Sequence, residues 1–199
     1  MNLIKKAIKN GGKITPLIIP MGTSGLMNPS IFVDNDEILV NLRHINYTLY
    51  HSENTQKFFS PWGPLSYLHP EKDMNLKTTN YLVSLNPDLS INKYCIVDTT
   101  KLDVNPIWHF IGLEDARLTK WENKYYLSGV RRDTTTNGEG RMELSEIEID
   151  KDNWTAREVS RIRIPAPIDE NSYCEKNWMP ILDKPYHYIK WTSPTELVK

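Results

Sequence analysis

The chain has 199 residues, of which 39% are hydrophobic and 25% charged, and its formal net charge at pH 7 is −1. This composition predicts a globular protein with a sizeable core, and the balanced charge excludes a strongly basic surface that recruits nucleic acid or anionic membranes. The two cysteines, Cys95 and Cys174, are far apart in the sequence and have no Cys-x-x-Cys spacing, so we expect neither a disulfide framework nor a metal site. The chain begins without a secretory signal and has no apolar run of membrane-spanning length, which predicts a cytoplasmic protein.

Residues 1–27 are expected to form an N-terminal segment outside the main domain. An apolar stripe opposite three lysines predicts a short helix that ends at Gly11-Gly12. The stripe consists of Leu3, Ile4, Ala7 and Ile8. We interpret it as a small packing helix or a tail rather than a membrane anchor. The apolar residues 16–20 have the composition of a short strand.

Three hairpins with the same register follow this segment. Each begins with a polar residue, and an apolar triplet follows about ten residues later, after a polar turn. The pairs are Asn28 with Ile38-Leu39-Val40, Asp115 with Tyr125-Tyr126-Leu127, and Asn177 with His187-Tyr188-Ile189. Second hairpins follow the first two, over residues 81–97 and 142–164. Tyr81 and Met142 are about 61 residues apart, and Asp115 and Asn177 about 62, so two independent markers share one period.

A four-stranded unit repeating at this length is typical of a β-propeller with large blades. The expected fold class is therefore all-β, with residues 28–199 forming a partial propeller. Its parts are blade 1 (28–98), blade 2 (115–164) and the start of blade 3 (177–199). A closed propeller needs at least about four blades, and these residues supply about two and a half. We expect the remaining blades from a longer chain or another subunit, unless the period has another origin.

The first strand of each propeller blade lines the central channel, so residues at equivalent starts converge on one mouth. Asn28, Asp115 and Asn177 should therefore face a common cavity. Their neighbours Glu114, Arg117, Glu175, Lys176 and Trp178 should lie close to it. The alternative is that Asn and Asp merely cap the hairpins, because both residue types satisfy backbone donors in turns.

The second strand of the first hairpin carries polar residues on both faces, which is typical of an exposed edge or of the lining of a wet cavity. Because it follows an inner strand, we expect Arg43, Asn46 and Tyr47 to contact a ligand. Arg131 and Arg132 occupy the corresponding place after the second hairpin, so we expect them to contact the ligand as well. The alternative is that they are solvated charges on a loop.

About thirty residues separate this strand from Tyr81, far more than the corresponding link in the second unit. This insertion contains four aromatic residues: Phe58, Phe59, Trp62 and Tyr67. Such rings can stack on the apolar faces of sugars or can hold the loop down as a small cluster, and we favour the structural role.

Cleaving a glycosidic bond requires an acid that protonates the leaving oxygen and a group on the other face that supplies or holds the nucleophile. Asp115 is the best candidate acid, with Glu114 acting to raise its pKa and Arg117 to lower it. Two options stay open for the second role. Glu175 or Asp133 could activate water, or cationic side chains could hold phosphate. These cations are Arg43, Arg117, Arg131, Arg132 and Lys176.

Residues 112–118, Gly-Leu-Glu-Asp-Ala-Arg-Leu, together with Lys124-Tyr125-Tyr126, carry a family likeness. They resemble the Gly-x-Glu-Asp-Pro-Arg and x-Tyr-Tyr pattern of the five-bladed propellers of glycoside hydrolase family 130, the β-mannoside phosphorylases and their hydrolase relatives. Residues 175–180 resemble the start of another blade in related propellers, some of them associated with glycosyltransferases. Ala116 stands where the family usually has Pro.

The resemblance implies that Asp115 is the proton donor and that Arg117 with Arg43 binds phosphate or sugar hydroxyls. It implies no organic cofactor, with inorganic phosphate as a possible co-substrate. We therefore expect an enzyme acting on an oligosaccharide or glycoside, preferably by phosphorolysis of β-linked mannosides. The alternatives are a glycan-binding propeller module without turnover, associated with a glycosyltransferase, and a scaffold whose interface is an open blade edge. Sugar identity, linkage and oligomeric state do not follow from the sequence.

Overall fold

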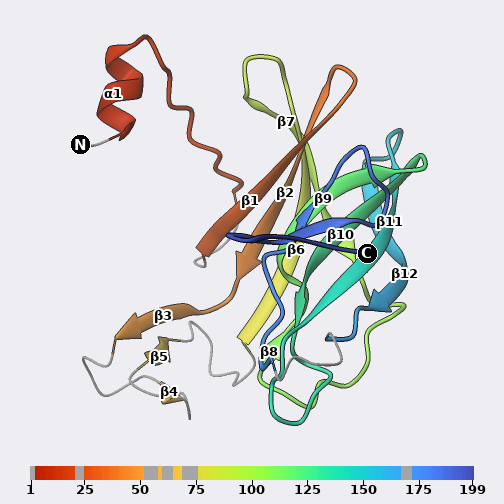
Figure 1. The fold of residues 1–199 in the computed structure, drawn as a ribbon. Coiled ribbons are helices and arrows are strands. Elements are labelled where there is room, and N and C mark those ends of the chain that lie inside the picture. The colour runs from red at the N-terminus through yellow and green to blue at the C-terminus, as the bar shows by residue number, and fades with distance from the viewer. Residues whose placement is uncertain (1–2, 21–24, 52–57, 60–64, 69–75, 167–171) are drawn as a thin grey trace.

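The computed structural model of the protein is almost entirely β (Figure 1). It describes residues 3–20, 25–51, 58–59, 65–68, 76–166 and 172–199. These residues form one short helix and fifteen strands. The expectation of an all-β protein is confirmed.

The first four-stranded unit contains both hairpins predicted for residues 28–98. Strands β1 (Gly25–Asp34), β2 (Glu37–Ile45), β6 (Leu76–Leu85) and β7 (Ile91–Asp98) pair antiparallel in that order. The polar turn between β1 and β2 contains Asn35 with φ 55°, a left-handed conformation that Asn tolerates well. Buried Leu39, Val40, Leu82 and Val83 form the middle of this sheet.

The second unit repeats this arrangement. Strands β9 (Glu114–Trp121), β10 (Lys124–Arg131), β11 (Arg141–Asp150) and β12 (Thr155–Arg163) pair antiparallel in chain order. Glu122 and Asn123 join β9 to β10, and both have positive φ, as a two-residue hairpin turn requires. The predicted hairpins of the second unit are therefore present.

The two units close on each other as a nearly closed, barrel-like sheet. Strand β7 pairs with β12 in parallel, through Val97 with Ala156 and Asp98 with Arg157. On the other side β1 lies beside β9, where the Leu118 amide donates a hydrogen bond to Ser30 Oγ (2.9 Å). Apolar side chains from both units fill the space between them. They include Leu39, Leu82, Leu118, Leu127 and Ile147.

A third, smaller sheet packs on the second unit. Its strands are β13 (Met179–Pro180), β14 (Tyr188–Thr192) and β15 (Thr195–Val198), and β13 lies beside β9. Trp121 from β9 packs edge-on against Tyr188, and Trp178 joins the same core. The sequence predicted one hairpin here, so β15 is an addition. The first strands of the three units, β1, β9 and β13, thus lie in succession.

The N-terminal segment behaves as a tail. Helix α1 (Leu3–Lys9) has no buried residue, and Figure 1 shows it standing away from the sheets. The helix prediction is confirmed, but not the packing role. Residues 16–20 form no strand, although Ile19 is buried against Val40, Leu42 and Val83. No helix in the described ranges is long and apolar enough to cross a membrane.

The predicted insertion contains a small sheet of β3 (Thr48–His51), β4 (Phe58–Phe59) and β5 (Leu65–Leu68). The short strand β8 (Phe110–Ile111) pairs with the start of β6. Trp62 lies outside the described residues, and so do the side chains of Phe58, Phe59 and Tyr67. The role expected for these aromatics therefore stays a prediction.

Candidate functional site

Asn28 and Asp115 meet at the starts of the first two units. The Asn28 side-chain amide donates a hydrogen bond to Asp115 Oδ1 over 2.5 Å, although the residues are 87 positions apart in the sequence. The predicted convergence of these two residues is confirmed. It follows from the contact between β1 and β9, which places their N-terminal ends side by side.

Asn28, Asp115 and Asn177 share a left-handed backbone conformation, with φ of 47°, 53° and 64°. The strand pairing is irregular at the first two positions, between Met27 and Ser30 and opposite Asp115 between Ser128 and Val130. Such bulges redirect a side chain away from the regular alternation of a strand. Asn and Asp are the non-glycine residues that best tolerate this conformation, so the local geometry accounts for the residue type at all three starts.

Gly112 sets the path of the chain into the Glu114–Asp115 pair. Its φ is 97°, and a Cβ atom there would lie 2.3 Å from the carbonyl oxygen of Thr78. Its amide donates to Asp133 Oδ2 (2.8 Å). The motif therefore needs glycine at this position because β6 passes so close. Asp133, a candidate base in the sequence, instead holds this turn.

Arg43 joins both carboxylates of the motif. Its Nη1 lies 2.6 Å from Asp115 Oδ1 and its Nη2 lies 3.1 Å from Glu114 Oε2. The side chain is buried, and Nη2 also donates to Tyr47 Oη (3.0 Å) and Thr78 Oγ1 (3.2 Å). Tyr47 and Thr78 thus fix the guanidinium in the orientation that serves the two acids. Thr78 was not singled out in the sequence, although it lies in the polar run 77–80 of a strand.

Glu114 is the more buried of the two acids, with 13% of its side chain exposed against 25% for Asp115. Burial raises the pKa of Glu114, while the charges of Arg43 and Arg132 oppose that rise. Its Oε1 lies 3.8 Å from Arg132 Nε and has no hydrogen-bond partner among the described residues. A buried carboxyl with an unsatisfied oxygen favours its protonated form.

The start of the third unit lies at the same end of the molecule. The charge of Lys176 also opposes the rise in the pKa of Glu114. Arg132 Nη2 donates a hydrogen bond to Cys174 Sγ over 3.0 Å. Glu175 is buried, where it accepts a hydrogen bond from Trp178 Nε1 (3.1 Å) and lies 3.6 Å from Lys190 Nζ. An open hollow of about 520 Å³ runs along this segment. It is lined by Cys174, Glu175, Lys176, Asn177, Trp178 and Lys190, among others.

Asn177 shares the backbone conformation of the other two starts but not their contact. It is exposed and forms no hydrogen bond with Asn28 or Asp115 in the part of the chain that the structure describes. It lies instead beside Lys176 in the hollow. The three-way meeting expected from the sequence is therefore observed for the first two residues only.

Several predicted ligand contacts have other partners. Arg131 is buried and pairs with Glu143 (2.7 Å) and Asp133 (3.2 Å), so its charge is already compensated. Asn46 accepts a hydrogen bond from the Lys77 amide (2.7 Å), which ties the end of β2 to β6.

Trp178 and Arg117 also differ from expectation. The Trp178 ring belongs to the core between the second and third units, so it is not a free stacking surface. Arg117 forms no hydrogen bond or ion pair with any described residue, and its Nε is buried without a partner. The expected contact between Arg117 and Asp115 is absent there.

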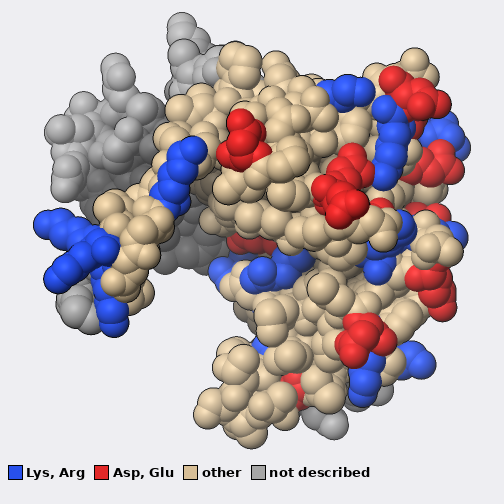
Figure 2. Space-filling model, turned by 90° about the horizontal axis from the view of Figure 1, so that it is seen from above, with Lys and Arg blue, Asp and Glu red and all other residues tan. Residues whose placement is uncertain are grey.

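The resulting cluster combines two adjacent acids, one buried arginine that serves both, and two further cations. It consists of Asn28, Arg43, Glu114, Asp115, Arg132 and Lys176; we call it the mouth cluster. Acidic and basic side chains are otherwise interspersed over the face seen in Figure 2. Within the described residues, no group of three or more His, Cys, Asp or Glu could hold a metal ion. Chemically, the cluster can exchange protons with a ligand and bind hydroxyl or anionic groups.

Comparisons with known proteins identify no relative: no protein-family model, no curated protein and no solved structure matches the chain.

Proposed function

We propose that the protein is a carbohydrate-active β-propeller that cleaves a glycosidic bond at the mouth cluster, with Asp115 as the general acid. The observation that carries this proposal is the contact of Asn28 and Asp115 at equivalent starts of two four-stranded units. A propeller accounts for that contact, because its first strands line one channel.

The order of the strands supports the propeller. Each complete unit is an antiparallel meander in which the first strand lies next to the neighbouring unit. The first strands β1, β9 and β13 follow one another side by side. The third unit then contributes the beginning of a further blade.

Asp115 is the better placed of the two acids to reach a substrate. It is the more exposed one, and both of its hydrogen bonds use Oδ1, so Oδ2 has no donor among the described residues. In the proposed reaction Asp115 gives its proton to the leaving oxygen. Arg43, already 2.6 Å away, stabilises the carboxylate that forms.

Glu114 lies beside Asp115 on the more buried side of Arg43. Burial raises the pKa of Glu114 against the charge of Arg43, which the two acids share. Arg132, whose Nε lies 3.8 Å from Glu114 Oε1, and Lys176, whose charge also acts on Glu114, are the cations best placed to hold a phosphate nucleophile. Water in that place gives hydrolysis instead of phosphorolysis.

A second function, glycan binding without turnover, is favoured by one observation. Asp115 Oδ1 already accepts hydrogen bonds from both Asn28 and Arg43. A carboxylate held in this way is also suited to accepting hydrogen bonds from sugar hydroxyls through its other oxygen.

The test is incubation of the purified protein with β-1,4-linked mannobiose, with and without inorganic phosphate, and detection of mannose 1-phosphate and mannose. Asp115→Asn is expected to lower the rate by roughly 10²- to 10⁴-fold, as loss of a general acid does. Asp183→Asn is the matched control and should keep the activity, because Asp183 is exposed in the third unit and its side chain forms no hydrogen bond or ion pair with another described residue.

The outcomes separate the two functions. Release of mannose 1-phosphate that depends on Asp115 supports phosphorolysis. If no product forms with phosphate or water while mannobiose still binds, the binding module is favoured and the catalytic proposal is wrong.

A further inference from the structure

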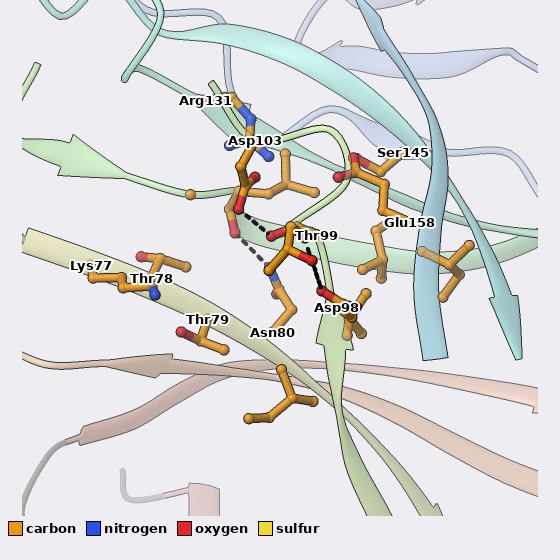
Figure 3. A pocket seen from close by; sticks show the side chains of 17 residues that line it. Lys77, Thr78, Thr79, Asn80, Asp98, Thr99, Asp103, Arg131, Ser145 and Glu158 are labelled. Carbon is orange, nitrogen blue, oxygen red and sulfur yellow. Dashed lines mark hydrogen bonds between the residues drawn. The ribbon is translucent and has the colours of Figure 1, made fainter. Parts of the chain in front are cut away.

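A second cavity lies between the two four-stranded units, apart from the mouth cluster (Figure 3). Its volume is about 130 Å³, and its walls come from β6, β7, β10, β11 and β12, the segment that follows β7 and the two residues that precede β9. A cavity of about 150 Å³ holds one benzene molecule, so this cavity takes a six-membered ring or a group of about that size. That is the size of one sugar ring or a short polyol.

The walls combine hydroxyl groups with aliphatic surface. The hydroxyls belong to Thr78, Thr99 and Ser145, and the aliphatic groups to Val97, Leu113, Leu127 and Ile147. Thr78 and Ser145 are buried, so these polar groups belong to the interior and not to a solvated surface. A molecule that presents both hydroxyls and C–H groups matches this lining.

The hydroxyls have hydrogen-bonding capacity left. Thr78 Oγ1 accepts from Arg43 and has no acceptor for its own hydrogen among the described residues. Ser145 Oγ donates to Glu158 (2.5 Å), which leaves its lone pairs for a donor. Thr99 Oγ1 donates to Asp103 Oδ2 (2.9 Å), which leaves its lone pairs as acceptors. The cavity therefore offers both donors and acceptors to a ligand hydroxyl, which needs both.

The buried charges in the wall are already compensated. Arg131 pairs with Glu143 and Asp133, and Glu158 pairs with Arg161, which also lies 3.2 Å from Asp103. At the rim, Lys77 and Asp98 are exposed and of opposite sign. An ionic ligand would leave its own charge or a wall charge without compensation, which is costly in a buried site. The lining therefore selects against charged molecules.

We propose that this cavity is a binding site for a small neutral polyhydroxylated molecule, a monosaccharide or a polyol of similar size. Its lining includes no member of the mouth cluster, and Thr78, which lines the cavity, touches that cluster through the hydrogen bond that its Oγ1 accepts from Arg43. The site does not depend on catalysis at Asp115, so either proposal can fail without the other.

The experiment uses ¹⁵N-labelled protein and follows its amide resonances during titration with erythritol, mannose and glucose. Glucosamine and glucuronate serve as the charged counterparts of glucose. At least one neutral compound should cause saturable shifts, and these are expected at residues 77–80, 97–103, 112–113 and 145. Both charged compounds should bind at least about tenfold more weakly than that neutral compound.

Two cavity variants and two controls locate the site. Ile147→Phe fills the cavity and should abolish the shifts, while Thr99→Val removes one lining hydroxyl at nearly unchanged shape and should weaken binding about fivefold. Asp115→Asn and Asp183→Asn should bind as the unaltered protein does. Circular dichroism and thermal unfolding of each variant show whether it is folded, and Thr99→Val keeps the test valid if Ile147→Phe is not folded.

Three results would overturn the proposal. One is the absence of saturable shifts with every neutral compound at tens of millimolar. Another is equal binding of the neutral and charged compounds. The third is binding that survives in both cavity variants, or shifts confined to the mouth cluster.

Discussion

Arg43 Nη1 lies 2.6 Å from Asp115 Oδ1, although the two residues are 72 positions apart in the sequence. The contact connects the second strand of one unit to the first strand of the next. Because Arg43 also binds Glu114, one buried guanidinium compensates two adjacent acids. It is therefore both a structural link between the units and the centre of the mouth cluster.

Replacing Arg43 with Met should destabilise the fold strongly. The change leaves Glu114 and Asp115 without their shared cation. We expect the free energy of unfolding to fall by about 3 kcal/mol, which is the lower end of the range for breaking a buried ion pair, because Asp115 is partly exposed. The control is Arg157→Met, whose pair with Glu148 is exposed and whose loss should cost at most about 1 kcal/mol. Urea unfolding measures both, and losses of equal size would contradict the role given to Arg43.

Asn28 should tolerate glycine better than a β-branched residue. Its φ of 47° suits Gly, whereas Val in that conformation costs about 1–2 kcal/mol more. Thermal or urea unfolding should therefore rank Asn28→Val below Asn28→Gly in stability. Asn35→Gly, in a turn with φ 55°, should stay within about 0.5 kcal/mol of the unaltered protein. Equal stability of Asn28→Gly and Asn28→Val would show that the backbone at residue 28 is not left-handed in solution.

The repeated hairpins and the Asn28–Asp115 contact could be predicted because both depend on local patterns. Alternating apolar residues and polar turns define each strand, and a shared register places the polar starts at one end. The parallel pairing of β7 with β12 and the nearly closed sheet could not be predicted. Two residue pairs join those strands, and residues so far apart leave no local signal.

The roles of the two adjacent arginines were harder to predict. Arg131 is the last residue of β10 and faces the interior, where it pairs with Glu143. Arg132 lies just beyond the strand and reaches Glu114 and Cys174 instead. A shift of one residue moves a side chain to the opposite face of a strand, so the strand end had to be known to within one residue.

Asp34 should stabilise the end of the molecule opposite the mouth cluster. It accepts hydrogen bonds from Lys120 Nζ (2.8 Å) and from Tyr125 Oη, and the one from Lys120 is the main cause of its lowered pKa. An acid with a lowered pKa stabilises the fold above its ordinary value of 3.8, and this stabilisation is lost as the pH falls.

Asp34→Asn should therefore lower the free energy of unfolding by about 1–2 kcal/mol at pH 7. The difference from the unaltered protein should shrink as the pH falls below 3.8. Asp36→Asn should show no such dependence, because Asp36 lies in the same turn but its side chain forms no hydrogen bond or ion pair with another described residue. Urea unfolding between pH 3 and 7 measures all three proteins, and a constant deficit for Asp34→Asn would contradict the pairing.

Glu114 gives the opposite dependence on pH. Burial raises its pKa above the ordinary 4.5, against the charges of Arg43, Arg132 and Lys176. An acid with a raised pKa binds its proton more tightly in the folded state, so its stabilisation is complete below pH 4.5 and is lost as the pH rises through the raised value.

Glu114→Gln does not titrate, so its stability relative to the unaltered protein should increase as the pH rises above 4.5. Taking the difference between the two proteins cancels the other titrating groups, including Glu143, whose pKa burial also raises. If urea unfolding shows the unaltered protein gaining on Glu114→Gln over this range, the attraction of the surrounding cations outweighs burial, and the raised pKa of Glu114 is wrong.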